Sequence, residues 1–274
     1  MEARAMTNTI LDVRELSVSI DQRQLLIDVS FSLKAGEVTA IVGTNGAGKS
    51  TLLRAIAGDK PFTPTKIVDE KHLSGIYFCE KSISRWSQQE LAKHIAVLPQ
   101  ISQLNFPFTL ADVVGLGRIP HSTGAQLDGE IVEAAMQATD VVHLKDRFYT
   151  QVSGGEQQRC QLARVMAQIW RSEDATPRLL LLDEPTAALD LSHQQQLMCA
   201  VQNFSKQGVA VLMVVHDINL ASTYADNIIA LQQGRILCNG PVAEVLNQPL
   251  LDNLFGGDVH LFFHPKTGKP LVLS

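Results

Sequence analysis

The chain has 274 residues, of which 45% are apolar and 19% charged, and its net charge at pH 7 is -5. This length suits one large α/β domain or two small ones, and the apolar fraction supports a sizeable core, which argues against a disordered chain. The acidic balance argues against a broad basic face for nucleic acid, although a local basic patch stays compatible with it, because non-specific binding depends on Lys and Arg that neutralise phosphates.

Cysteines and apolar runs indicate the setting of the chain. Cys79, Cys160, Cys199 and Cys238 are far apart and form no C-x-x-C pair, so neither a zinc site nor a redox motif is indicated. We interpret them as small core residues of a protein from a reducing compartment. The N-terminus has no apolar segment typical of a secretory signal, and no apolar run approaches the roughly 18–20 residues that span a bilayer. We therefore expect a soluble chain.

The first elements lead to a glycine-rich loop. Residues 10–34 alternate in polarity and predict antiparallel strands with a turn near 21–23. An apolar run over 38–42 predicts a buried strand, and residues 51–57 predict a helix. Between these two elements Gly43–Ser50 reads GTNGAGKS, which fits the G-x-x-x-x-G-K-[ST] phosphate-binding loop.

This loop has the chemistry that a triphosphate requires. Glycines let the backbone approach a ligand, the inward N–H groups surround an anion, and the following helix directs its positive dipole end at it. Lys49 adds a charge for the outer phosphates, and the Ser50 hydroxyl can bind Mg²⁺. A glycine-rich turn that binds nothing is the alternative, and the Lys-Ser pair argues against it. The residues expected to contact nucleotide are Gly43, Thr44, Asn45, Gly46, Ala47, Gly48, Lys49, Ser50 and Thr51.

Turn-rich and helical segments follow the loop. Residues 58–74 are polar and predict a surface excursion, after which 76–78 predict a short strand, 88–93 a helix and 95–98 a strand. Residues 101–150 carry no convincing strand pattern and predict a helical insertion. Its helical patterns lie at 110–116 and 128–142.

Strands and helices alternate in the rest of the chain. The predicted elements are a helix at 155–171, a strand at 178–183, a helix at 192–206, a strand at 209–215 and a helix at 217–224. Such alternation predicts a parallel sheet covered by helices. Residues 227–238 predict a hairpin, and the tail from Pro241 predicts one or two short helices and a final pair of strands.

A pair of acids ends one of these strands. The apolar run at 179–182 leads into Asp183 and Glu184, which alone could be a solvated loop start. In a parallel sheet, however, ligands bind outside the carboxyl ends of the strands, where the glycine loop also lies. We expect Asp183 to hold Mg²⁺ opposite Ser50, and Glu184 to accept a hydrogen bond from an attacking water.

A third motif points to a family. Val152–Gln157 reads VSGGEQ at a helix start, and Ser153 with Glu156 forms a capping-box pattern that could be only a well-capped helix. Together with the loop and the acid pair, it resembles the LSGGQ-type signature of ATP-binding cassette (ABC) proteins. The family's other motifs are present in the family order: Leu98-Pro99-Gln100 like the Q-loop, LLLLDEP at 179–185, Ala188-Leu189-Asp190 like the D-loop, and His216 like the H-loop.

The resemblance implies a fold for the whole chain. It implies a P-loop NTPase with a RecA-like core, an N-terminal antiparallel β subdomain and an inserted helical subdomain. We expect a single ATP-binding domain over 1–274, with the helical subdomain at about 101–160 and a short tail at about 250–274.

The resemblance also implies a mechanism. Two such domains would face each other as a homodimer, with each ATP between the glycine loop of one copy and the signature of the other. Glu184 would be the general base, His216 would bond the γ-phosphate, Gln100 would sense the metal and the water, and Asp190 would join the two sites. The expected signature contacts are Ser153, Gly154, Gly155 and Glu156.

Three features depart from the family pattern. The family often places an aromatic residue before the first turn to stack on adenine, whereas the matching position here is Ile20 with no aromatic nearby. Weak base selectivity is therefore expected. The signature begins with Val152 in place of leucine, which should matter little, and 59–74 is longer than the family needs.

Local sequence narrows the kind of cassette. Translation factors usually carry two cassettes and repair ATPases long coiled coils, and a GTPase would need an N-K-x-D motif, which 143–146 lacks. Residues 104–121 resemble the importers of iron–siderophore, cobalamin and haem, most closely the haem subgroup. Within them, Phe106 and Phe108 could pack in the core or form the groove that grips a coupling helix of a membrane subunit.

The resemblance implies partners and a place in the cell. We expect two polytopic permease subunits, an indirect periplasmic substrate-binding protein and a peripheral position on the cytoplasmic face of the bacterial inner membrane, with ATP and Mg²⁺ as ligands and no nucleic acid. Haem itself should not touch the chain, and His260 and His264 should be surface residues of the tail. The alternatives are an importer of iron–siderophore or cobalamin, a non-transport clamp on nucleic acid or protein, and a cassette without turnover, against which Glu184 and His216 argue.

Overall fold

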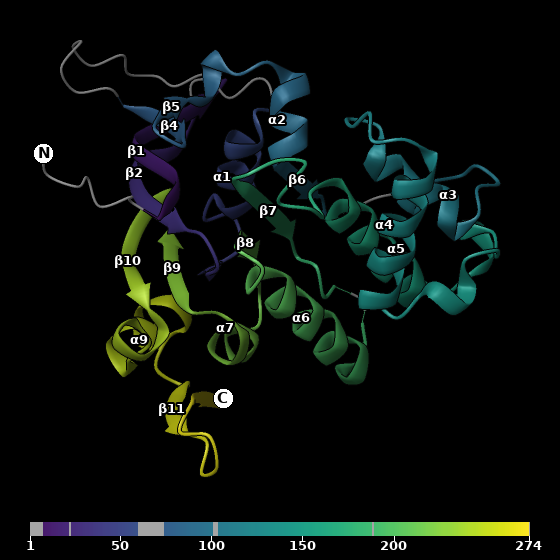
Figure 1. Cartoon of the computed structure of the whole chain (residues 1–274). Coiled ribbons are helices and arrows are strands. Elements are labelled where there is room, and N and C mark those ends of the chain that lie inside the picture. Colours follow the sequence, from purple (N-terminus) through teal and green to yellow (C-terminus); the bar gives the residue numbers. More distant parts are fainter. Residues whose placement is uncertain (1–7, 22, 60–73, 101–103, 188, 274) are drawn as a thin grey trace, which may run out of the picture.

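A six-stranded sheet forms the centre of the computed structural model, which describes residues 8–21, 23–59, 74–100, 104–187 and 189–273 (Figure 1). The strand order is β10-β9-β3-β8-β7-β6, and only β10 runs antiparallel to its neighbour. The strands are β3 (Val38–Gly43), β6 (Ile95–Leu98), β7 (Arg178–Asp183), β8 (Val209–Val214), β9 (Asn227–Gln232) and β10 (Arg235–Pro241).

The central strands are rich in apolar residues because both faces of the sheet are covered. Every residue of β7 and of β8 is buried, as expected for parallel strands between layers of helices. Parallel pairing of β3 with β8 and of β8 with β7 aligns their carboxyl ends. The glycine loop after β3 and the acid pair at the end of β7 therefore lie at one edge of the sheet, which confirms the predicted parallel sheet.

A second, antiparallel sheet packs beside the first. Its order is β2-β1-β4-β5, formed by β1 (Thr9–Ile20), β2 (Arg23–Lys34), β4 (Gly75–Phe78) and β5 (Lys81–Ser82). The predicted strands and turn are confirmed, whereas the two-residue β5 was too short to show a pattern. A shared apolar cluster that includes Leu11, Leu26 and Leu212 joins this sheet to one face of the central sheet.

Helices cover the other surfaces of the molecule. They are α1 (Lys49–Ala57), α2 (Gln88–His94), α3 (Leu110–Gly115), α4 (Ala125–Ala138), α5 (Gly154–Gln168), α6 (Leu191–Ser205), α7 (Ile218–Tyr224), α8 (Val242–Val245) and α9 (Gln248–Phe255). The helices α3, α4 and α5 share a core of their own, built around Val113, Ile131 and Cys160, and project to one side of the sheets in Figure 1.

Two of the predicted helices had wrong boundaries. The helix α4 begins three residues earlier than expected because Gly124, at φ 93, turns the chain into it, and it ends before Asp140, which adopts φ 55. The helix α5 ends at Gln168 rather than 171, where the chain leaves the helix so that Trp170 can stack on Phe204. Residues 60–73 of the predicted surface excursion lie outside the described residues.

The tail contains the predicted small elements. After the β9–β10 hairpin come α8, α9 and a two-stranded sheet of β11 (His260–Phe263) and β12 (Pro270–Leu273). His260 and His264 are exposed, as expected. Among the cysteines, Cys160 is buried but Cys199 is exposed on the outer face of α6, so the core assignment was wrong for Cys199. Over the described ranges, no helix combines the length and apolarity that crossing a bilayer requires.

Candidate functional site

The glycine loop is held against two neighbouring strands. A Cβ added at Gly43 would lie 2.0 Å from the Leu231 carbonyl oxygen of β9, and one added at Gly48 would lie 2.9 Å from the Leu25 carbonyl oxygen of β2. Gly48, directly before α1, also adopts φ 103, a backbone angle that residues with a Cβ atom rarely adopt. Larger residues at these two positions would push the loop away from the sheet, so the glycines fix its shape.

Lys49 lies inside this loop. Its ammonium group donates to the carbonyl oxygens of Gly43, at 2.8 Å, and Thr44, at 3.0 Å, and only 6% of the residue is exposed. Burial lowers the pKa of Lys49, while the nearby Glu184 and Asp183 carboxylates oppose that shift. An ammonium has three donors, so two hold the loop closed and one is left for a phosphate oxygen.

Ser50 and Asp183 face each other at the start of α1 and the end of β7. The Ser50 hydroxyl donates to Asp183 Oδ1 at 3.2 Å, and only 3% of Asp183 is exposed. Burial raises the pKa of Asp183 despite that hydrogen bond, and the charge of Glu184 adds to the increase. A hydroxyl and a carboxylate are oxygen ligands of the kind that Mg²⁺ prefers, and a cation would offset the cost of the buried charge. The pair therefore fits the expected metal.

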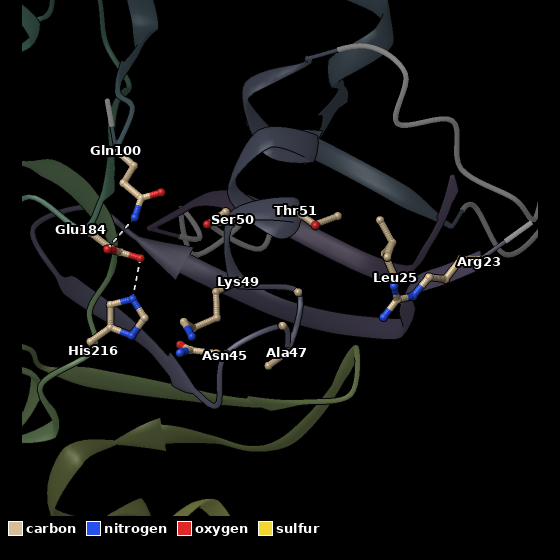
Figure 2. Close-up of a pocket in the computed structure, with 12 residues that line it drawn as sticks. Arg23, Leu25, Asn45, Ala47, Lys49, Ser50, Thr51, Gln100, Glu184 and His216 are labelled. Carbon is tan, nitrogen blue, oxygen red and sulfur yellow. Dashed lines mark hydrogen bonds and ion pairs between the residues drawn. The ribbon is translucent and has the colours of Figure 1, made fainter. Parts of the chain in front are cut away.

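Two side chains from different strand ends converge on the carboxylate of Glu184 (Figure 2). Gln100 Nε2 donates to Glu184 Oε2 at 2.8 Å, and His216 Nε2 lies 2.5 Å from Glu184 Oε1. Because an ionised carboxylate only accepts hydrogen bonds, His216 is the donor. Glu184 adopts φ 51, an uncommon backbone conformation that turns the chain directly after β7. Both carboxylate oxygens are thus held by groups that reach from β6 and β8.

These groups share one pocket of about 560 Å³ with the glycine loop. Gln100, Glu184 and His216 line one end, and Arg23 and Leu25 line the opposite end, with the loop between them (Figure 2). Ile20, the position that matches the family's adenine-stacking aromatic residue, is not among the described residues that line the pocket. The side chains found at the base end are those of Arg23 and Leu25.

Arg23 and Leu25 were missed because no motif marks them. The β1–β2 register shifts between Val18 and Ser19, opposite Leu25, and such an irregularity re-aims side chains. The Leu25 carbonyl oxygen is also packed against Gly48 and against Gly234, where an added Cβ would lie 2.5 Å away. Only the three-dimensional pairing brings this strand start to the glycine loop.

The signature residues lie elsewhere. Ser153 caps α5, its hydroxyl accepting from the Glu156 N–H at 3.3 Å while Glu156 Oε2 accepts from the Ser153 N–H at 2.7 Å. The Ser153 hydroxyl also donates to Glu156 Oε2 at 2.7 Å, and this bond together with the one from the Ser153 N–H holds the pKa of Glu156 below its usual range. Neither these two residues nor Gly154 and Gly155 line the pocket of their own chain. The capping box predicted from the sequence is confirmed.

The D-loop residue also lies outside this pocket. Asp190 caps α6 through a bond from the His193 N–H at 2.9 Å, and its Oδ1 lies 2.8 Å from His193 Nδ1. His193 had not been singled out in the sequence. Ala188, the first residue of the predicted D-loop, lies outside the described residues.

An apolar patch lies on the surface near α3. Phe106 is 63% exposed and Phe108 39% exposed, their rings 6.2 Å apart, so the core-packing alternative was wrong. Ile119 and Phe148 are exposed as well, and Phe148 pairs with Thr109 in an isolated β-bridge. We call Phe106, Phe108 and Phe148, which ring and backbone contacts bring together, the apolar patch.

The chain has close relatives among known proteins. It matches the ABC transporter family over residues 26–187. It is 43% identical to the Hemin import ATP-binding protein HmuV of Pseudomonas entomophila, over 97% of this chain and 100% of that protein. Its identity to the HmuV protein of Gloeobacter violaceus is also 43%, over 96% of this chain and 94% of that protein.

Solved structures share the fold. The structure of cbiO1 from Clostridium perfringens, part of the ABC transporter complex cbiONQ, is 28% identical with a TM-score of 0.74, covering 90% of this chain and 94% of that one. The ADP conformation of MJ1267, an ATP-binding cassette of an ABC transporter, is 23% identical with a TM-score of 0.77, covering 92% and 100%. These likenesses confirm the P-loop fold expected from the sequence.

Proposed function

This chain belongs to the ABC transporter family and is the ATP-hydrolysing subunit of an importer, and we propose that the imported cargo is haem (hemin) or a related iron chelate. The proposal for the cargo is supported by 41–43% identity to hemin import ATP-binding proteins over nearly the whole chain. Importers of iron–siderophore or cobalamin are the alternatives that experiment must separate.

The pocket that joins the glycine loop to Glu184 is the observation that carries the assignment of roles. We propose that Gly43–Thr51 binds the triphosphate, with the remaining donor of Lys49 on the outer phosphates. Ser50, Asp183 and Gln100 would hold Mg²⁺, which neutralises phosphate charge when bound. Glu184 would orient the attacking water, and His216 would bond the γ-phosphate.

Nucleotide binding would rearrange the hydrogen bonds of the catalytic carboxylate. In this structure Gln100 and His216 both donate to Glu184. We propose that His216 and Gln100 turn toward the phosphate and the metal, which frees the oxygens of Glu184 for water. In phosphoryl transfer, most of the catalysis comes from positioning the reacting groups and from neutralising the phosphate charge, and these are the roles proposed for the three side chains.

A second copy would complete each site. Ser153, Gly154, Gly155 and Glu156 lie outside the pocket of their own chain, at the N-terminus of α5, where the helix dipole favours an anion. We propose that they contact the γ-phosphate bound to the opposing copy, with Asp190 near the junction. The working unit would then be a homodimer of a single-domain chain, 1–274, with a helical subdomain at about 101–160.

Membrane permeases are the partners that an import ATPase implies. We propose two permease subunits, one docked on the apolar patch of each copy of this chain. The exposed rings of Phe106, Phe108 and Phe148 form a surface suited to an amphipathic helix. A periplasmic substrate-binding protein would deliver the cargo, and the chain would sit on the cytoplasmic face of the bacterial inner membrane.

Reconstitution tests the cargo directly. The chain is combined with its permeases and substrate-binding protein in proteoliposomes, and ATP hydrolysis is measured with hemin, an iron–siderophore or cobalamin. We expect hemin to stimulate hydrolysis and to accumulate inside the vesicles. If only cobalamin or an iron–siderophore stimulates hydrolysis, that ligand and not haem is the cargo. Salt-sensitive binding of nucleic acid without any permease would favour a non-transport clamp.

A further inference from the structure

We propose that the guanidinium of Arg23 stacks on the nucleotide base, in place of the aromatic side chain that this chain lacks, and so makes base recognition tolerant of both purines. The inference rests on the proposed binding of the triphosphate by the glycine loop. It concerns the opposite end of the same pocket, to which no predicted residue was assigned.

The geometry of the pocket fixes the direction in which a nucleotide extends. Its phosphate end is defined by Lys49 and by Glu184, so the base must point away from them, toward the end lined by Arg23 and Leu25 (Figure 2). No Phe, Tyr or Trp is among the described residues that line the pocket. Among the described residues that line this end of the pocket, Arg23 is the one with a planar group that can cover a base.

The strand start that carries Arg23 is rigidly placed. Arg23 is the first residue of β2 and pairs with Ile20 across the turn. Two residues later, the Leu25 backbone is fixed between Gly48 and Gly234, because neither glycine could accept a Cβ against the Leu25 oxygen. The phosphate loop and the base end are thus held at a constant separation by direct backbone contact.

The chemistry of the two side chains suits a purine without selecting one. A guanidinium is planar, weakly hydrated and stacks on aromatic faces, and bases are stacked on arginine planes in nucleic-acid complexes. Leu25 is partly buried and offers only apolar contact. In the described part of the chain, the side chain of Arg23 makes no ion pair and no hydrogen bond, so its guanidinium is available to a ligand. Stacking without hydrogen bonds to the base edge discriminates little between adenine and guanine.

Binding measurements on the full chain with Mg²⁺ test the proposal. The dissociation constants of ATP, GTP and base-free tripolyphosphate are measured by calorimetry for the wild type, Arg23→Ala, Arg23→Lys and Arg23→Tyr. Arg85→Ala, at an exposed position that does not line the pocket, controls for the change in net charge.

Stacking predicts a distinctive pattern. Arg23→Ala should weaken ATP and GTP by about 2- to 5-fold, the range of an exposed cation–π contact, and leave tripolyphosphate unchanged. Lysine keeps the charge but has no plane, so Arg23→Lys should lose as much, while Arg23→Tyr should restore ATP binding. The wild type should bind ATP and GTP within a few-fold of each other, and Arg85→Ala should match it.

Four results would overturn the proposal. Unchanged ATP binding by Arg23→Ala would show that the guanidinium does not contact the base. Equal weakening of tripolyphosphate, or rescue by lysine, would show that Arg23 acts only through its charge on the phosphates. A wild type that binds no ATP would overturn the nucleotide site itself, and the stacking role with it, which separates failure of the proposed function from failure of this inference alone.

Discussion

At the scale of single residues, Glu184 is the group that we propose to orient the attacking water. Its two oxygens accept from Gln100 and His216 in this structure, and it lies in the same pocket as the glycine loop. We predict that Glu184→Gln binds ATP but hydrolyses it about 10²- to 10⁴-fold more slowly, because an amide of the same shape cannot take a proton from water. Phosphate release and equilibrium ATP binding measure the two effects separately, and full turnover by this variant would contradict the assigned role.

Lys49 should control affinity. Its ammonium closes the loop through the Gly43 and Thr44 carbonyl oxygens and has one donor left for phosphate. We predict that Lys49→Ala weakens ATP binding by about 10- to 100-fold, the equivalent of one hydrogen bond to a charged group. Calorimetry measures this change, and Lys206→Ala, at an exposed position after α6, is the matched control. Wild-type affinity in the Lys49 variant would remove the lysine from the site.

Residue-level prediction from sequence succeeded where chemistry is concentrated in a short motif. The glycine loop, Asp183 and Glu184 follow apolar strands, so their meeting at one sheet edge could be expected. Arg23 could not be found in this way, because its place depends on the irregular β1–β2 register and on backbone packing against Gly48.

At the scale of secondary-structure elements, the cap of α5 is expected to have two functions. Ser153 satisfies backbone donors at the helix start and is proposed to face a phosphate, whereas Ser87 forms the same capping box with Glu90 at α2, outside the pocket. We predict that Ser153→Ala and Ser87→Ala each lower the free energy of unfolding by about 1 kcal/mol. Only Ser153→Ala should also lose ATP hydrolysis.

Chemical denaturation and phosphate release distinguish the two functions of the cap. Equal hydrolysis by the Ser153 and Ser87 variants, at equal loss of stability, would reduce the signature serine to a helix cap. Loss of hydrolysis by Ser87→Ala alone would place the functional helix start at α2.

The periodicity of apolar residues predicted most helices and strands correctly. The predictions failed where the backbone conformation of single residues determines where a helix begins or ends. Fully apolar runs gave the positions of β7 and β8, and alternation gave β1 and β2. The start of α4 was missed because Gly124 begins the helix ahead of its apolar face, and Asp128 in the first turn then pairs with the buried Arg118 at 2.8 Å. An ion pair between two segments gives no regular spacing of apolar residues, so it cannot be recognised from the periodicity of the sequence.

At the scale of the whole molecule, the expected signature contacts lie apart from the nucleotide pocket. The pocket is lined by residues of the glycine loop, including Ser50, and by Glu184, whereas Ser153 and Asp190 lie outside it. The antiparallel sheet shares an apolar cluster with one face of the central sheet, and the helices α3–α5 have a cluster of their own. The separation of Ser153 from the pocket is compatible with the site shared between two copies that we propose.

Crosslinking tests that shared site most directly. In a Glu184→Gln background with the exposed Cys199 replaced by Ser, Asn45→Cys marks the glycine loop and Ser153→Cys the signature, and a short bifunctional thiol reagent is added with or without Mg²⁺ and ATP. Variants that carry only one of the two introduced cysteines, Asn45→Cys or Ser153→Cys, serve as controls and report any reaction of Cys79, Cys160 or Cys238. The account predicts that a covalent dimer forms only when both cysteines and nucleotide are present. If the doubly substituted chain binds ATP yet never forms that dimer, the claim that two copies share each nucleotide is contradicted.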